Sequence, residues 1–262
     1  MILVLAATLL YVSAALMLAV SLRQPEKENN RSWLPLAILA MIFHGEMHAE
    51  VWRQAQAPEL HFFATLSLAT LGMSALTTGL ALSGRMTSLG LIVFPLAAMS
   101  SLLYRLGDHA PPIALGWQLQ LHAWIALSAY AVLAVAALLA ILLWVQERTL
   151  RKRGTHRWPR ILPPLTELER MMFRSISLGF LLLSATLLTG ALFVHDLLSQ
   201  QLAHKTVLSL LSWVIFGILL FGRWRYGWRG IKAARLTLLA MLLLALSFFG
   251  SQFVYEFVLR RG

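Results

Sequence analysis

The sequence of 262 residues contains no cysteine and has few charged side chains. Without cysteine there can be no disulfide, cysteine-ligated zinc, iron–sulfur cluster, thiol nucleophile or thioether link to a cofactor. Charged residues make up 13% of the chain, against about 25% in a typical soluble domain. This shortage argues against a soluble enzyme, a disordered tail and a coiled coil. The chain also has no nucleophile elbow and no triad signature, which argues against hydrolytic catalysis.

Apolar residues make up 59% of the sequence, and the mean hydropathy is +0.72. A helix of roughly 20 apolar residues is long enough to cross a bilayer. The second and fourth runs are the weakest, because one contains two histidines and two glutamates and the other is short and includes Pro95. The sequence predicts an all-α, polytopic membrane helical bundle that forms a single integral-membrane domain over 1–262. Its eight expected spans are 2–22, 33–52, 60–82, 87–104, 119–146, 172–194, 206–222 and 234–258.

The net charge of +11 is distributed unevenly between the two sets of connecting segments. Seventeen of the 22 Lys and Arg residues fall in alternate connections, and five fall in the other set and the C-terminal end. Basic residues are concentrated on the cytoplasmic side of membrane proteins. The asymmetry therefore predicts that both termini lie on the outer, periplasmic side of a bacterial inner membrane. The charge itself is explained by orientation and lipid contact, so no nucleic-acid partner is expected.

The longest connection, 147–171, is the basic cytoplasmic segment of this arrangement. Pro159, Pro163 and Pro164 would interrupt any helix that leaves the fifth span. Thr166 and Glu169 then have the spacing of a capping box. The sixth helix is therefore expected to begin near residue 166, below the membrane.

Seven of the eight histidines fall on or near the outer face, His156 being the exception. His44 and His48 are four residues apart and share a helix face. With Glu50 they could ligate a divalent metal, or they could instead hydrogen-bond to neighbouring spans. The segment HGEMHAE lacks the HExxH order of a zinc protease. The surface histidines His109 and His204, and His61 at the membrane interface, have simpler explanations as solvated residues.

His122 and His195 form a second candidate pair, because both lie at outer helix ends at comparable depth. Axial ligation of haem iron takes imidazoles on opposite faces of a planar ring, usually from different helices. The aromatic residues near that level could cover such a ring, although tryptophans also gather at any membrane interface. They are Trp117, Trp124, Phe193 and Trp213. Asp196 could orient His195, or the two could form a solvated helix end.

Four segments resemble a known membrane-protein family. They are LHAWIALSAYAVLAVAALLAILLWVQ (121–146), ISLGFLLLSATLLTGALF (176–193), HKTVLSLLSWVIFGILLFGRWRYGWRG (204–230) and FFGSQFVYEF (248–257). The second is similar to the signature G-F-x-L-L-T-x-x-x-x-T-G, and the third ends in G-W-R-G. Together they resemble the cytochrome c assembly family of CcsA/CcmC type, which handles haem, and most closely its inner-membrane YpjD branch.

The resemblance implies a protein that binds haem at the outer face for cytochrome c maturation. It places His122 on the family's first external haem ligand, His44 loosely on an intramembrane ligand, and Lys205 on the lysine after a tryptophan-rich external motif. The chain departs from the family where that motif should lie, since residues 194–204 read VHDLLSQQLAH. The second external histidine and the second intramembrane histidine are also missing, so at most two of four ligands remain. His195 could replace one of them.

Three functions remain open at this stage. The first is a haem-handling protein related to cytochrome c assembly, which holds haem b non-covalently through His122 with His195 or His44. The second is a cofactor-free scaffold or regulatory membrane subunit that works with a membrane partner, such as another protein of cytochrome assembly. The third is a metal-ion transporter lined by His44, Glu46, His48 and Glu50. In each, the lipid bilayer is the surrounding partner.

Overall fold

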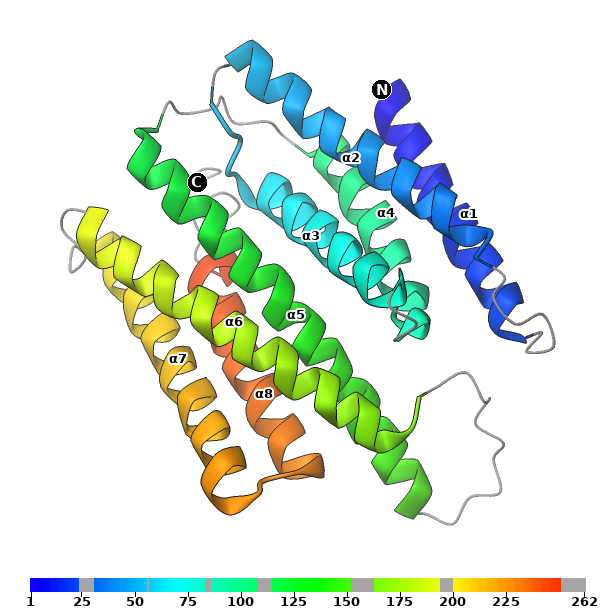
Figure 1. Cartoon of the computed structure of the whole chain (residues 1–262). Coiled ribbons are helices and arrows are strands. Elements are labelled where there is room, and N and C mark those ends of the chain that lie inside the picture. Colours follow the sequence, from blue (N-terminus) through cyan, green and yellow to red (C-terminus); the bar gives the residue numbers. More distant parts are fainter. Residues whose placement is uncertain are drawn as a thin grey trace. The chain divides into compact units, whose positions relative to one another are not determined.

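The computed structural model describes residues 1–23, 31–55, 57–82, 86–107, 115–151, 163–193 and 200–250, the side chains of 200–203 excepted (Figure 1). Helices account for nearly all of these residues, and none of them forms a strand. The predicted all-α bundle is confirmed. The helices are α1 (Ile2–Arg23), α2 (Trp33–Ala55), α3 (Phe62–Leu82), α4 (Gly90–Leu106), α5 (Trp117–Arg151), α6 (Leu165–Phe193), α7 (Gln200–Tyr226) and α8 (Gly230–Ala245), with a 3₁₀ turn η1 (Thr87–Leu89) and a π turn η2 (Leu246–Gly250).

Seven of the helices in the described part of the chain are long and apolar enough to cross a membrane. They include α4 together with η1, despite its internal Pro95. The remaining helix is α2, whose second half carries the histidines and glutamates that weakened the prediction of the second span. The chain is therefore a multi-pass membrane protein. The expected helix start near residue 166 is also confirmed, because α6 begins at Leu165.

The chain folds as two compact units. The first comprises residues 1–115 with 157–162, and the second comprises 116–156 with 163–262. Among the described residues, unit 1 thus contains α1 to α4 and unit 2 contains α5 to α8 with η2. The single integral-membrane domain over 1–262, with 147–171 as its basic connection, stays a prediction.

Unit 1 is built on α1 and α4, which pack on each other, with α2 against α1 and α3 against α4. Its apolar core contains Tyr11, Leu18, Trp33 and Phe94, all nearly inaccessible to solvent. The face of α3 that packs inward is unusually polar, with six buried serines and threonines. Several of these hydroxyls donate to carbonyls of their own helix, as Ser74 Oγ does to Thr70 O at 2.9 Å. Such bonds satisfy a buried hydroxyl without a partner from another helix.

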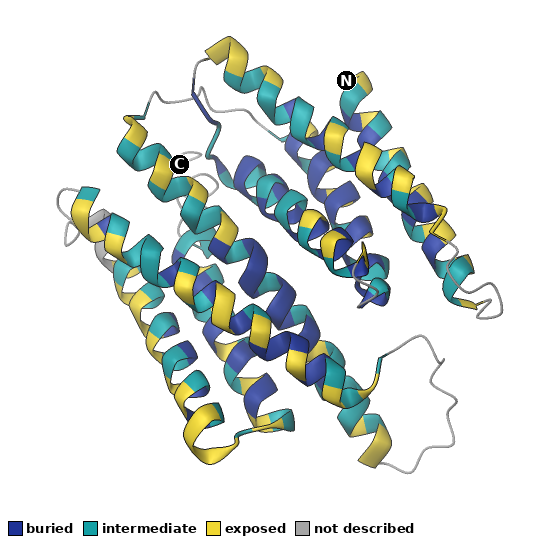
Figure 2. Cartoon of the chain, viewed as in Figure 1, coloured by how far each residue is buried: buried dark blue, intermediate teal, exposed yellow. Residues whose placement is uncertain are grey.

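Unit 2 is organised around α5, the longest helix, which packs against α6 and α8 while α7 packs on α8 and α6. Gly179 of α6 allows a close approach to α5, because a Cβ there would overlap the side chain of Leu133. Figure 2 shows the middle of α5 buried and much of α6 and α7 exposed along one side. Exposed leucines such as Leu181 and Leu188 are the expected surface of a helix that faces lipid.

The turn from α7 to α8 contains the G-W-R-G segment, and its glycines are required by the backbone. Gly227 and Gly230 have φ angles of +63° and +60°, a region that disfavours side chains. Gly227 ends α7 by donating to Arg223 O at 3.2 Å, as in an αL cap. Trp228 covers Gly222, where a Cβ would overlap the indole ring. The segment that supported the family resemblance is thus a structural turn.

A buried carboxylate anchors this turn to α6. Glu169 has 6% of its side chain exposed and accepts hydrogen bonds from Arg223 Nη1 at 2.6 Å and from Arg229 Nε at 3.1 Å. The guanidinium of Arg223 also lies 4.7 Å from the centre of the Phe173 ring. Glu169, to which the sequence assigned a capping-box role, is instead engaged by two arginines from the turn between α7 and α8.

Candidate ligand pocket

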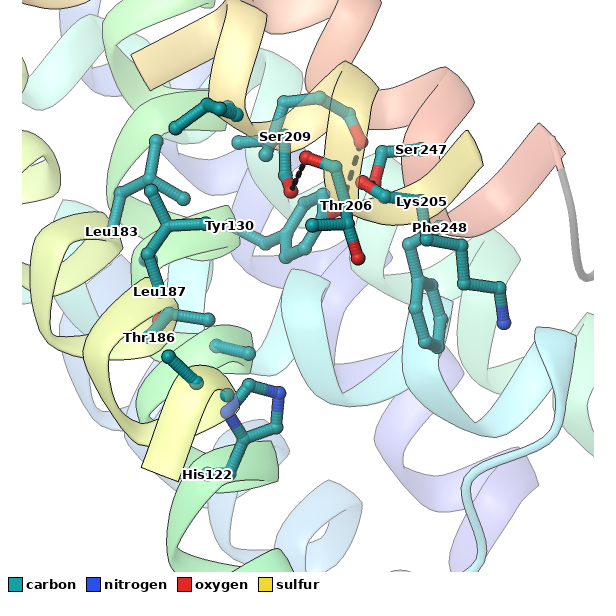
Figure 3. Close-up of a pocket in the computed structure, with 16 residues that line it drawn as sticks. His122, Tyr130, Leu183, Thr186, Leu187, Lys205, Thr206, Ser209, Ser247 and Phe248 are labelled. Atoms are coloured by element: carbon teal, nitrogen blue, oxygen red, sulfur yellow. Dashed lines mark hydrogen bonds between the residues drawn. The ribbon is translucent and has the colours of Figure 1, made fainter. Parts of the chain in front are cut away.

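Unit 2 contains a pocket of about 360 Å³ at the end where α5 and α7 begin and α6 ends (Figure 3). The walls are mainly aliphatic and aromatic, with a few polar groups among them. A cavity of this size and lining is typical of a site for a small molecule or cofactor. The lining residues are His122, Ala126, Ala129, Tyr130, Leu183, Thr186, Leu187, Gly190, Ala191, Lys205, Thr206, Ser209, Leu210, Leu244, Ser247 and Phe248.

His122 is held in a defined orientation by α6. Its Nδ1 lies 3.0 Å from the hydroxyl oxygen of Thr189. That hydroxyl donates its own proton to carbonyls of α6, with Ala185 O at 2.8 Å and Thr186 O at 3.0 Å. When Thr189 donates to one of those carbonyls, it accepts from His122, and in that tautomer Nδ1 carries the ring proton and Nε2 keeps a lone pair. In that tautomer the imidazole can act as an acceptor or a metal ligand through Nε2.

The glycine after Thr189 gives the imidazole ring its space. A Cβ at Gly190 would lie 3.2 Å from Cε1 of His122, closer than almost all real contacts of this kind. Thr189 and Gly190 are the T-G pair of the signature segment 176–193. In this fold both residues contact His122. Thr189 is its hydrogen-bond partner, and Gly190 leaves room for its ring.

The opposite wall of the pocket comes from α7 and η2, and it contains Lys205. Figure 3 shows Lys205, Thr206 and Ser209 together with Ser247 and Phe248 on this side. Ser247 Oγ donates to the backbone carbonyl of Lys205 at 2.9 Å, which ties the start of α7 to η2. Tyr130 of α5 completes the wall, with its hydroxyl donating to Leu244 O at 2.7 Å.

The structure places the predicted aromatic residues outside this cavity. Trp213 Nε1 donates to Ser184 Oγ at 2.8 Å, and its ring stacks on Phe180 with 5.4 Å between centroids. Trp124 is partly exposed and does not line the pocket. The pocket's aromatic rings are instead those of Tyr130 and Phe248. Sequence reasoning missed both, although Phe248 belongs to the FFG segment quoted for the resemblance.

Of the predicted cofactor-binding residues, His122 and Lys205 line the same pocket. His195 and its neighbour Asp196 lie outside the described residues. His44 belongs to unit 1, as does the proposed metal set. His204 is exposed at the start of α7 and is not among the lining residues.

His44 and His48 in unit 1 are hydrogen-bonded to one hydroxyl. Ser67 Oγ of α3 lies 2.7 Å from His44 Nε2 and 2.9 Å from His48 Nε2. Tyr11 Oη lies 3.2 Å from the other nitrogen of His44. A hydroxyl has one proton and two lone pairs, so at most one imidazole accepts from Ser67 and at least one donates to it. The two histidines thus have the hydrogen-bonding arrangement that the sequence left open beside metal binding.

The carboxylates of the predicted metal set point to other partners. Glu50 is exposed, with its Oε1 3.5 Å from Gln54 Nε2, and Glu46 pairs with Arg53. Another carboxylate of unit 1, Glu59, was not part of that set. It lies before α3 and accepts from the hydroxyl of Tyr104, and its Oε2 lies 3.7 Å from His61 Nε2. Within the residues that the structure describes, no three His, Asp or Glu side chains are grouped so as to hold a metal ion.

Comparison with known proteins finds a matching family and several similar proteins. The family profile described as cytochrome C assembly protein matches residues 4–259. The chain is 34% identical over 138 residues to inner membrane protein YpjD of Escherichia coli K12, covering 52% of each chain. It is 38% identical over 146 residues to an uncharacterized 28.8 kDa protein of Azospirillum brasilense, covering 55% of this chain and 54% of that one. It is also 27% identical over 148 residues to cytochrome c biogenesis protein CcsA of Chlamydomonas reinhardtii, covering 56% and 40%.

The chain thus spans about half the length of the curated relatives it matches. The profile match, by contrast, extends over both units. The predicted setting, a multi-pass protein of the inner membrane, agrees with the apolar helices and with the E. coli relative.

Proposed function

Because the chain belongs to the cytochrome c assembly protein family, we propose that it is a haem-handling membrane protein that binds haem b non-covalently in the pocket of unit 2. The observation that carries the proposal is the state of His122. Its Nδ1 lies 3.0 Å from the hydroxyl of Thr189, and its ring lines a pocket with mainly apolar walls, where the tautomer protonated at Nδ1 offers the lone pair of Nε2. Without cysteine, the chain can hold haem only through such non-covalent contacts.

The residues of the pocket fit a haem. A bound haem would supply an iron atom that can take a neutral imidazole as ligand, and His122 would hold it. His122 presents that imidazole from α5, and Thr189 fixes its tautomer as an outer hydrogen-bond partner does for a metal ligand. Leu183, Leu187 and Phe248 provide the apolar surface that excludes water from a porphyrin face. The role of His195 as the opposite axial ligand stays a prediction.

The distribution of charge supports an outward-facing pocket. The pocket lies at one end of unit 2, near the start of α5, whereas Arg151 ends that helix and Arg223 lies near the end of α7. If the arginine-rich end is cytoplasmic, as the positive-inside rule requires, the pocket faces the periplasm and both termini are outside. Haem bound there would be accessible to a membrane partner of cytochrome assembly.

A haem titration of the purified protein tests this proposal. In detergent, the wild-type chain should develop a Soret band with haem b, and His122→Ala should weaken the binding at least about tenfold. His204→Ala is the matched control, because this exposed histidine lies in the same unit but outside the pocket lining. If wild type shows no Soret band, or if His122→Ala binds as wild type does, the proposal is wrong. A stoichiometric membrane partner would then favour the cofactor-free scaffold.

A further inference from the structure

Lys205 is the one cation among the described residues that line the pocket, and none of these lining residues is acidic. Its charge is also left without an ion pair within the described part of the chain. The arginines of the turn between α7 and α8 differ from it in this respect, since Arg223 and Arg229 share Glu169. A cation in a largely apolar pocket is costly unless it faces an anion or water. The ammonium lies beside the Phe248 ring, so a positive charge that the walls do not neutralise borders the pocket on the side of α7 and η2 (Figure 3).

The fold holds Lys205 in place from the side of η2. Ser247 donates to its backbone carbonyl at 2.9 Å, and its ammonium lies 5.7 Å from the centre of the Phe248 ring. Both contacts come from the π turn Leu246–Gly250, which follows α8. Here the turn places Ser247 and Phe248 beside a lysine that lines the cavity.

The two polar groups of the pocket would bind different parts of a ligand. His122 on α5 offers a lone pair, and Lys205 on α7 offers a positive charge. The rest of the pocket surface is mainly apolar and includes Leu183, Leu187 and Phe248, which Figure 3 labels. A matching ligand has an apolar body, an electrophilic centre for the imidazole and an anionic group for the ammonium.

We propose that Lys205 is the anchor for a carboxylate of the bound ligand and that the pocket selects porphyrins with free carboxylates over neutral ones. The inference rests on the proposed function, since haem b combines an iron centre with two carboxylates on one edge. The carboxylate edge then lies beside α7 and η2, and the iron lies on the side of His122.

The test compares haem b with its dimethyl ester, which has the same iron and ring but no free carboxylate. Binding of each is titrated optically to the detergent-solubilised wild-type chain, Lys205→Gln and Lys205→Arg. Lys205→Gln should weaken haem b binding about tenfold and leave the affinity for the ester unchanged, and Lys205→Arg should restore most of the loss. Lys232→Gln is the matched control, because that residue lies in the first turn of α8, with its ammonium 3.6 Å from the Trp228 ring centre, and does not line the pocket.

The outcomes separate this inference from the proposed function. If wild type binds neither ligand, the proposed function is wrong, and the carboxylate anchor is rejected with it. If wild type binds haem b and Lys205→Gln binds it equally well, only the anchor is rejected. An equal loss for haem b and for the ester would assign Lys205 a structural role and would also overturn the inference. In His122→Ala, metal-free protoporphyrin IX should still bind in a Lys205-dependent way, since that contact does not involve the iron.

Discussion

Thr189 Oγ1 lies 3.0 Å from His122 Nδ1, across the interface between α6 and α5. The threonine hydroxyl also lies within hydrogen-bonding distance of two carbonyls of its own helix, so a proton donated there leaves Thr189 as the acceptor for Nδ1 of His122. The relationship connects a signature segment of the family to the residue that the resemblance identified as a haem ligand. It also gives the first of several predictions that can be measured.

Thr189→Val keeps the shape of the side chain and removes the acceptor for His122. Loss of an outer hydrogen-bond partner typically lowers metal affinity about tenfold or more, so haem b binding should weaken by that factor. Thr189→Ser retains the hydroxyl and should restore most of the affinity. Optical titration measures the change. Equal affinities for wild type and Thr189→Val would show that this contact does not orient the imidazole.

Gly190→Ala should reduce haem binding by displacing the ring of His122. The new Cβ would lie 3.2 Å from Cε1 of that ring, so one of the two must shift. Gly217→Ala is the control, because its Cβ would make an ordinary contact 3.5 Å from Phe180. The affinity of each variant for haem b is compared at matched protein stability. A Gly190→Ala chain that binds haem normally would contradict the close packing inferred here.

Glu169→Gln tests the anchor of the turn between α7 and α8. Removing its charge leaves Arg223 and Arg229 without their carboxylate, and we expect the unfolding free energy to fall by about 2 kcal/mol. We expect a smaller fall in unfolding free energy than for a fully buried ion pair, because the side chains of both arginines are partly exposed. Glu167→Gln breaks the exposed pair with Arg170 and should cost less than about 0.5 kcal/mol. Unfolding in mixed detergent micelles compares the two, and similar losses would refute the assignment.

Ser67→Ala tests the buried arrangement in unit 1. This change removes the hydroxyl that contacts both His44 and His48, and leaving buried imidazole nitrogens unsatisfied should cost about 2 kcal/mol. Thr237→Ala is the comparison, because its buried hydroxyl bonds only to Ala233 O of its own helix. Thermal unfolding should show the larger loss for Ser67→Ala. If Thr237→Ala is the more damaging change, the shared hydroxyl is not a significant source of stability.

The absence of cysteine makes the predicted orientation directly measurable. Single cysteines replace Trp117 at the start of α5 and Leu150 near its end, both exposed residues. A membrane-impermeant thiol reagent added to whole spheroplasts should label Trp117→Cys, and label Leu150→Cys only after the membrane is opened. The reverse pattern would place the termini in the cytoplasm.

The helices and their class were predictable because they depend on local composition. Runs of apolar residues must form helices in a bilayer, where every backbone polar group needs an internal partner. The start of α6 was also foreseen, since Pro163 and Pro164 restrict the backbone before it. The second span was among the weakest predictions, and α2 is the one described α-helix that is not among the candidate membrane spans.

The partners of individual polar side chains were not predictable in the same way. Glu169 has capping-box spacing from Thr166, yet its carboxylate contacts Arg223 and Arg229, more than 50 residues away. Trp213 lies at the depth expected for a haem wall, but its indole donates to Ser184 and stacks on Phe180. Spacing along the chain does not specify which helix a given face will meet, so these assignments required the packed structure.

The sequence by itself determined a cysteine-free, multi-pass helical membrane protein of a cytochrome c assembly family, and it singled out His122. Hydropathy and motif order are properties of the chain, and they survive any arrangement of the helices. Only the tertiary structure decided that Thr189 and Gly190 contact that histidine and that Lys205 lines the same pocket. It also decided that Ser67 lies within hydrogen-bonding distance of both His44 and His48. These relationships join residues from different helices, and they exist because side-chain packing brings distant segments within hydrogen-bonding distance.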